Sequence, residues 1–79
     1  MKEEEIYFKL NEIFRDVLDN NELEITSISN ANEIDEWDSL SHIQLVVAIE
    51  KTFNVKFTSS EIMKWNNVGE MVDAIITKI

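Results

Sequence analysis

The sequence contains no cysteine, no proline and a single glycine. Without cysteine the chain can form neither a disulfide nor a thiolate metal site, and this composition fits the reducing cytoplasm. His42 is the only histidine, so we expect no zinc or other metal centre. No apolar run approaches the ~20 residues that span a bilayer, and the amino-terminal MKEEEIYF is too acidic for a signal peptide. We therefore expect a soluble, cytoplasmic protein without membrane insertion.

Basic residues are also scarce. Sixteen acidic residues against seven basic ones give a formal net charge of -9. Such a surface repels nucleic acid and anionic lipid, and it attracts basic protein surfaces over about a Debye length. We expect protein partners and no nucleic acid. Composition alone, however, favours the simpler interpretation that the acidity keeps a small protein in solution.

The chain is short, at 79 residues, and no proline-rich or glycine-rich stretch divides it. We therefore predict one domain, residues 1–79. A chain of this size buries only about 60–65% of its unfolded surface, which leaves one thin core. A deep substrate cavity is not expected, and we predict a monomer that is not an enzyme.

Apolar spacing predicts an all-α fold, a small four-helix bundle with three longer helices and one short helix. Between residues 3 and 18, and again between 40 and 53, apolar side chains recur every three or four residues, as on core-facing helices. Thr58, Ser59 or Ser60 can cap a short helix, and Asn66 or Asn67 can cap the last one. The predicted core residues are Ile6, Leu10, Ile13, Phe14, Val17 and Leu18, then Leu40, Ile43, Val46, Val47, Ile49 and Phe53 with Leu45 and Ala48, and finally Val68, Met71, Val72, Ile75, Ile76 and Ile79.

A long loop, residues 20–38, separates the first and second predicted helices. Its segment LEITSIS, residues 23–29, alternates like a strand. A lone strand would leave its backbone groups without partners, so we expect no strand. The loop is instead predicted to pack on the helices through four apolar side chains, which are Leu23, Ile25, Ile28 and Ile34.

Ser39 stands where this loop meets the second helix. The simplest interpretation is that Asp38, Ser39 or Ser41 caps the helix. Catalysis by Ser39 with His42 would also need an orienting group, an oxyanion hole and a substrate cleft, which the sequence does not supply. A hydroxyl at a helix N-terminus can alternatively carry a phosphodiester, because free N–H groups and the positive end of the helix dipole lie beside it.

The tetrapeptide WDSL, residues 37–40, followed by SHIQLVVAIEKTFNVKF, resembles the acyl carrier protein family. The resemblance covers nearly the whole chain and continues through SSEIMKW and NVGEMVDAI. It implies a carrier that holds acyl intermediates as thioesters on a 4'-phosphopantetheine arm and presents them to biosynthetic enzymes. Ser39 would be the attachment point, to which a phosphopantetheinyl transferase moves the arm from coenzyme A. Asp38 matches the acid that helps the transferase manage its metal ion.

The family shelters its acyl chain against the second helix. By resemblance, Val47, Ile49, Ile62 and Trp65 are candidates for lining such a pocket, although core packing alone explains each of them at least as well. Trp65 stands where the family more often has an aliphatic residue, so it either reshapes the pocket or serves as a large core residue.

Fatty-acid-type carriers place acidic residues along the second helix, and this sequence departs from that pattern. The positions are occupied by Ser41, Gln44, Lys51 and Thr52. Only Glu50 remains. Trp37 is typical of discrete carriers of specialised biosynthetic clusters, although it could equally anchor the end of the loop. We therefore predict a specialised pathway rather than bulk fatty acid synthesis; the alternatives are an aminoacyl or D-alanyl carrier and an unmodified helical interaction module.

The expected partners are the transferase and acyl-activating, acyltransferase or synthase enzymes with basic docking surfaces. The acidic run before Ser39 lacks the ligand spacing of a calcium loop, so we expect weak divalent binding at most. Its charges are predicted to steer partners instead. His42 is expected to be a solvated surface residue. The predicted partner-binding residues are Glu33, Asp35, Glu36, Trp37, Leu40, Ile43 and Glu50.

Overall fold

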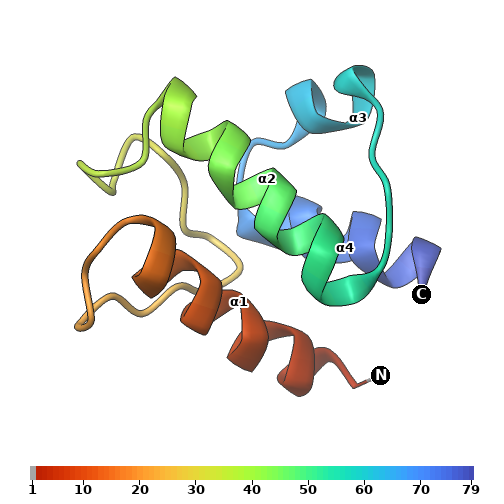
Figure 1. Ribbon diagram of the computed structural model, residues 1–79, viewed down its shortest axis with the longest axis horizontal. Coiled ribbons are helices and arrows are strands. Elements are labelled where there is room, and N and C mark those ends of the chain that lie inside the picture. Colours follow the sequence, from red (N-terminus) through yellow and green to blue (C-terminus); the bar gives the residue numbers. More distant parts are fainter. Residues whose placement is uncertain (1) are drawn as a thin grey trace.

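Four helices make up the chain, which is described over residues 2–79 by a computed structural model. They are α1 (Glu3–Val17), α2 (Ser39–Phe53), α3 (Ser59–Lys64) and α4 (Val68–Lys78) (Figure 1). No strand occurs between residues 2 and 79, so the predicted all-helical fold with one short helix is confirmed. None of the helices in this range is long and apolar enough to cross a membrane.

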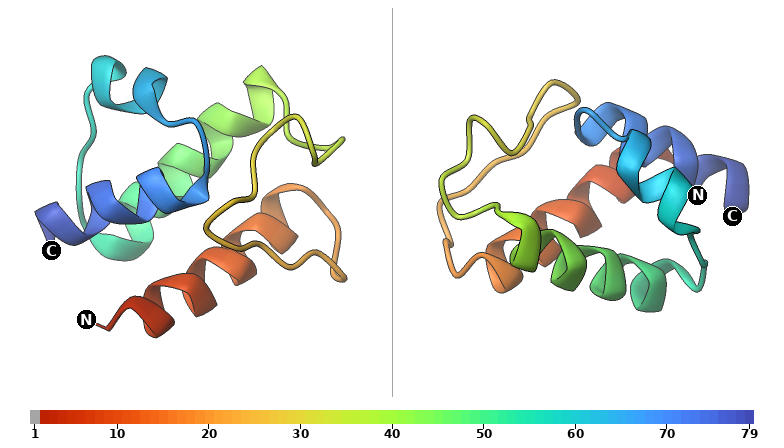
Figure 2. Two further views of the ribbon diagram at one scale, coloured as in Figure 1. Left: turned by 180° about the vertical axis from the view of Figure 1, so that it is seen from behind. Right: turned by 90° about the horizontal axis from the view of Figure 1, so that it is seen from above.

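Of the three longer helices, α2 and α4 both pack against α1. The loop from α1 to α2 covers one end of this bundle, and the two termini lie together near the other end (Figure 2). The short α3 lies beside α2 and α4 and connects them. This arrangement places the beginning of α2, the long loop and the α3–α4 connection on the same side of the molecule.

The core is formed by one face of each longer helix. Its fully buried side chains are Phe14, Ile6, Leu10, Leu45, Ile49, Met71, Ile75, Val68 and Val72. On α2 the core face is centred on Leu45, Ile49 and Phe53, which follow one another at four-residue intervals.

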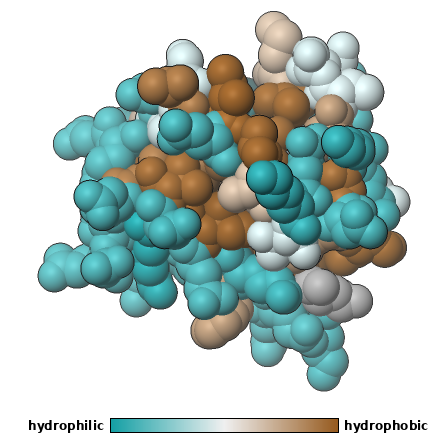
Figure 3. All heavy atoms as spheres, in the orientation of Figure 1, coloured by the Kyte–Doolittle hydropathy of each residue, from teal (hydrophilic) through white to brown (hydrophobic). Residues whose placement is uncertain are grey.

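The apolar side chains on the opposite face of α2 are exposed. Leu40 and Ile43 expose 68% and 63% of their surfaces, and Val47 exposes 44%. The prediction that these three residues belong to the core was wrong, because apolar residues occupy more of the α2 circumference than its neighbours cover. Ile76 of α4 and Ile79, which follows that helix, were also predicted as core and are exposed. In Figure 3 apolar atoms gather across the upper part of the face where α2 lies, bordered by hydrophilic ones.

The long loop is held partly by apolar contacts. Ile25 and Ile34 are buried as predicted, and Leu23 is half-buried against the core. Ile28 is 73% exposed, so its predicted packing was wrong. The reason is that the carbonyls on either side of it, those of Ser27 and Ser29, accept hydrogen bonds from α4, which leaves the intervening side chain outside.

Gly69, the only glycine, allows the loop to approach α4 closely. The N–H groups of Gly69 and Val68 donate to the carbonyls of Ser27 and Ser29, each at 2.9 Å. A Cβ atom on Gly69 would lie 3.0 Å from the Ser27 carbonyl oxygen and 3.3 Å from its Cβ. The glycine therefore serves a close contact between two backbones, and its φ angle is an ordinary helical one.

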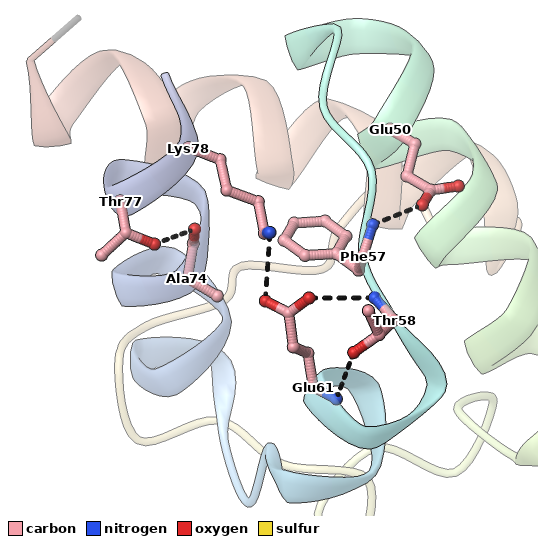
Figure 4. A network of polar contacts seen from close by, with 7 residues as sticks. All are labelled: Glu50, Phe57, Thr58, Glu61, Ala74, Thr77 and Lys78. Atoms are coloured by element: carbon pink, nitrogen blue, oxygen red, sulfur yellow. Dashed lines mark hydrogen bonds and ion pairs between the residues drawn. The ribbon is translucent and has the colours of Figure 1, made fainter.

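A polar network fixes α3 between α2 and α4 (Figure 4). The Phe57 N–H donates to Glu50 Oε2 at 2.9 Å, which ties the α2–α3 connection back to α2. Thr58 and Glu61 form a capping box at the start of α3, and Lys78 of α4 lies 3.2 Å from the Glu61 carboxylate. The hydrogen bond that the Glu61 carboxylate accepts from the Thr58 backbone N–H, together with this lysine, lowers the pKa of Glu61. Trp65, which directly follows α3, is thereby held at a defined place.

Candidate functional site

Ser39 is the first residue of α2 and is exposed to solvent. Asp38 precedes it as the helix cap, and its Oδ1 accepts a hydrogen bond from the Ser41 N–H at 2.9 Å. The Ser41 hydroxyl in turn accepts from the Asp38 N–H at 2.8 Å, which completes a capping box. Of the three candidate caps, Asp38 therefore serves as the cap and Ser41 as its reciprocal partner.

The two serines at this site differ in accessibility. Ser41 is only 8% exposed, and its hydroxyl also donates to the Glu36 carbonyl at 3.0 Å. That hydroxyl thus fixes the end of the loop to the start of α2. The Ser39 side chain faces solvent and is the one that a second protein can reach.

Asp38 is ionised at neutral pH. The hydrogen bonds from the backbone and the side chain of Ser41 lower the pKa of this exposed carboxyl below its ordinary value. Its negative charge lies at the N-terminus of α2, where the helix dipole favours an anion. The site therefore presents a hydroxyl and a carboxylate on adjacent residues.

An aromatic cluster lies next to these two residues. Trp37 is 7% exposed, and its ring meets the edge of Phe14 at a centroid distance of 5.0 Å. Its indole N–H donates to His42 Nδ1 at 3.1 Å, and the two rings stack at 6.0 Å. His42 also approaches Trp65 edge-on at 6.3 Å. The loop end is thus anchored through Trp37, which offers a partner little surface.

His42 is half-buried within this cluster. The prediction of a solvated surface histidine was wrong, because the two tryptophans that enclose it come from segments that sequence spacing does not place. Burial lowers the pKa of His42. Its acceptor role toward Trp37 also requires an unprotonated Nδ1.

A cleft of about 540 Å³ opens beside Ser39. The loop, the first turn of α2 and the α3–α4 connection form its walls. The residues that line it are Asn30, Ala31, Asn32, Trp37, Asp38, Ser39, His42, Trp65, Asn66, Asn67 and Met71. Amide and aromatic side chains therefore dominate a cleft whose edge carries the candidate hydroxyl.

Comparison with known proteins explains why an exposed serine and a capping aspartate stand together at the start of α2. Residues 9–75 match the family model described as the phosphopantetheine attachment site. The chain belongs to the acyl carrier protein family. It is 34% identical over 76 residues to an acyl carrier protein of Rubrobacter xylanophilus, covering 96% of this chain and 94% of that protein. A relative from Guillardia theta is 32% identical over 80 residues, covering 100% of this chain and 98% of that one.

The fold agrees with that of a solved member of the family. The solution NMR structure of a holo acyl carrier protein from Geobacter metallireducens matches with a TM-score of 0.85 and 40% identity, covering 91% of this chain and 83% of that one. The present chain is accordingly a carrier and not an enzyme, and its cofactor is a covalent 4'-phosphopantetheine arm. The predicted family and cofactor are confirmed.

The residues at the start of α2 fit this cofactor. Attachment of a phosphopantetheine needs an accessible hydroxyl, which Ser39 provides, and a phosphodiester is an anion that a helix N-terminus favours. Between residues 2 and 79, no three histidine, cysteine, aspartate or glutamate side chains form a group that could hold a metal ion.

Of the four residues proposed to line an acyl pocket, only Trp65 borders the cleft. Ile49 is fully buried in the core, Val47 lies on the exposed face of α2, and Ile62 is half-buried. Whether an acyl chain reaches these residues stays a prediction. Sequence reasoning missed Asn30, Asn67 and Met71 as cleft residues; Asn67 was foreseen only as a helix cap.

The predicted docking acids differ in their surroundings. Glu33 and Asp35 are exposed on the loop, and exposed Glu36 accepts from Asn20 Nδ2 at 2.9 Å. Glu50 is half-buried and is engaged by the Phe57 N–H. The acid retained on α2 thus has a structural role, which leaves the loop acids as the accessible negative charges near Ser39.

Proposed function

We propose that Ser39 carries the phosphopantetheine arm and that Asp38 assists the transferase that attaches it. The observation that carries this proposal is the contrast between exposed Ser39 and buried, hydrogen-bonded Ser41 in the same turn. Ionised Asp38, whose pKa is lowered by Ser41, stands beside the reacting hydroxyl as a ligand for the transferase's divalent metal. When bound, the arm supplies a thiol that holds the cargo as a thioester.

Ser39 and Asp38 have separate tasks in this proposal. Ser39 Oγ forms the new bond to the phosphorus that carries pantetheine, the phosphoanhydride bond of coenzyme A breaks, and adenosine 3',5'-bisphosphate leaves. The hydroxyl proton is taken up by the transferase or by water. The capping box fixes the Asp38 carboxylate, so its position does not depend on the partner. The N-terminal dipole of α2 favours the resulting phosphodiester.

We further propose that the carrier serves a specialised pathway rather than bulk fatty acid synthesis. The first turn of α2 contains no acidic residue, and Glu50 is engaged within the fold. The exposed residues Leu40, Ile43 and Val47 instead give α2 an apolar outer face. Partner enzymes would combine an apolar contact with this face and a basic contact with the acidic loop.

The test of attachment is incubation with coenzyme A, magnesium and a permissive transferase, followed by mass spectrometry. Wild type should gain one arm, and Ser39→Ala should gain none while retaining its helical circular dichroism. An unmodified wild type would overturn the proposal, and modification of Ser41 would reassign the site. Mass spectrometry of the carrier from its native cell would identify the cargo and would distinguish an acyl from an aminoacyl or D-alanyl group.

A further inference from the structure

The outer face of α2 ends in a groove lined by lysines. The exposed apolar side chains of this face form a stripe that consists of Leu40, Ile43 and Val47. Lys51 continues the stripe one helical turn after Val47. Exposed Lys56, in the α2–α3 connection, borders the same groove of about 410 Å³, which we call the lysine groove. The stripe therefore leads from the first turn of α2 to two lysines at the other end.

Glu50 does not cancel the positive charge of the lysine groove. It lines the groove, but it is half-buried, and its Oε2 accepts from the Phe57 N–H at 2.9 Å (Figure 4). Lys51 and Lys56 are exposed, and neither forms an ion pair with another side chain between residues 2 and 79. Two free lysines against one engaged glutamate leave this groove positive in a chain whose formal net charge is -9.

The opposite end of the stripe is negative. Glu33, Asp35 and Glu36 are exposed on the loop that leads into α2. Figure 1 shows this loop and the α2–α3 connection at opposite ends of the helix. A rise of 1.5 Å per residue places Leu40 and Lys51 about 16 Å apart along the axis. Because this separation exceeds the Debye length of about 8 Å, the two charged ends act separately on an approaching protein.

We propose that the lysine groove binds carboxylates of the partner enzyme and thereby orients that enzyme on α2. A partner that fits has an apolar ridge for the stripe, basic side chains opposite the loop acids and acidic side chains opposite Lys51 and Lys56. The inference rests on the proposed docking of partners on α2. It adds a requirement that a wholly basic docking surface does not meet, because the two lysines repel such a surface.

The charges of the chain disfavour other occupants of this face. Nucleic acid and anionic lipid would meet a net charge of -9. A second copy in antiparallel orientation offers the matching order of charges, but two chains with this net charge repel one another. Three apolar side chains are also few for a stable dimer, since a standard interface buries about 1,600 Å².

Two helical peptides of equal length test the order of charges. Both have the same leucine stripe with lysines at one end; the other end has glutamates in the bipolar peptide and lysines in the basic peptide. Binding is measured by NMR titration of the isotope-labelled chain without an arm, so the result does not depend on attachment at Ser39. The double variant Lys51→Gln/Lys56→Gln should bind the bipolar peptide about fivefold more weakly than wild type, as expected for two exposed ion pairs. It should bind the basic peptide more tightly than wild type does.

The matched control is Lys2→Gln/Lys9→Gln, which removes the same charge from the start of the chain and from α1. Lys9 borders a different surface, formed by α1 alone. This control should leave the ratio of the two peptide affinities unchanged. If it changes the ratio as the Lys51 and Lys56 variant does, net charge explains the effect and the proposal fails. Circular dichroism establishes that every variant keeps its helices.

The apolar stripe has a test of its own. Ile43→Ser should weaken the binding of both peptides, because it removes an exposed apolar contact from the centre of the face. If neither peptide binds wild type, or if Ile43→Ser leaves both affinities unchanged, docking on α2 fails together with this inference. If Ile43→Ser weakens both peptides and the lysine variant alters neither, only the role of the lysine groove is overturned.

A nitroxide label on the glutamate end of the bipolar peptide reports its orientation. The label should broaden the amide signals of residues 47–56 more than those of residues 33–43. Equal broadening at the two ends would overturn the inference, since the lysines would then not orient the peptide. Sedimentation of the wild-type chain tests the second copy. A dimer that dissociates in the Lys51→Gln variant would assign the lysine groove to that copy and would overturn the proposal.

Discussion

The indole N–H of Trp37 donates to Nδ1 of His42 at 3.1 Å, and this bond joins the end of the long loop to the first turns of α2. It exists only while Nδ1 is unprotonated. Since Trp37 also packs against Phe14 of α1, the bond connects the candidate arm site to the core. The stability of this region should therefore depend on the protonation of one histidine.

Burial lowers the pKa of His42 from its ordinary 6.5, so the unfolded chain binds a proton more readily than the folded one. The contribution of neutral His42 is fully present above pH 6.5 and is lost as pH falls through the folded pKa. The free energy of unfolding, measured with urea, should decline as pH is lowered through this window. The variant His42→Gln keeps an acceptor for Trp37 and does not titrate, so its unfolding free energy should decline less as pH is lowered. If the decline is as steep as in wild type, protonation of carboxylates and not of His42 causes it.

Ser41→Ala should separate folding from modification. It removes the reciprocal half of the capping box and leaves the Asp38 N–H and the Glu36 carbonyl without this partner. The expected loss is about 1–2 kcal/mol of unfolding free energy. The variant should still receive an arm, whereas Ser39→Ala should lose the arm with little change in stability. Equal losses of stability in the two variants would contradict the assigned roles.

Gly69→Ala should destabilise the chain although alanine is the better helix former. The added Cβ would lie 3.0 Å from a backbone oxygen of the loop, which cannot rotate away. Overpacking of this kind costs roughly 1–3 kcal/mol, against a propensity gain of about 1 kcal/mol. We expect a net loss of about 1 kcal/mol by urea unfolding. Asp73→Ala, at an exposed position of α4, is the control and should not be destabilised; a stabilised Gly69→Ala would show that the loop moves freely.

The sequence predicted the helices because their apolar periodicity and caps are local features. Thr58, Asn67 and Asp38 cap helices as polar residues at those positions should. The errors arose where a neighbouring segment decides the outcome. Ile28 is exposed because backbone bonds between the loop and α4 determine its position, and His42 is half-buried because Trp37 and Trp65 meet across it.

The candidate hydroxyl was predictable and the cleft was not. Ser39 stands in a short motif with a helix after it, and the family resemblance depends on such contiguous residues. The cleft joins Asn30, His42 and Trp65, which come from the loop, α2 and the end of α3. These residues lie close together because of tertiary packing, so neither apolar periodicity nor sequence spacing predicts that they meet.

Partner association should depend on the loop acids more than on Glu50. Glu33, Asp35 and Glu36 are exposed near the candidate arm site, whereas Glu50 is half-buried and accepts from the Phe57 N–H. Exposed charges steer a basic partner during approach, and salt screens them over about 8 Å. Neutralising the three loop acids to Gln or Asn should therefore slow association of the holo carrier with its cognate enzyme more than Glu50→Gln does. The difference should shrink as salt is raised.

The matched control neutralises Glu3, Glu4 and Glu5, which are exposed in the first turn of α1 and change the net charge by the same amount. These residues lie at the end of the molecule away from the loop that precedes α2 (Figure 1). Asp38 is kept in every variant because we propose that it assists the transferase. Stopped-flow kinetics at two salt concentrations provides the rates. If the α1 variant slows association as much as the loop variant, net charge and not its placement steers the partner. If Glu50→Gln has the larger effect, docking uses the α2 acid despite its bond to Phe57.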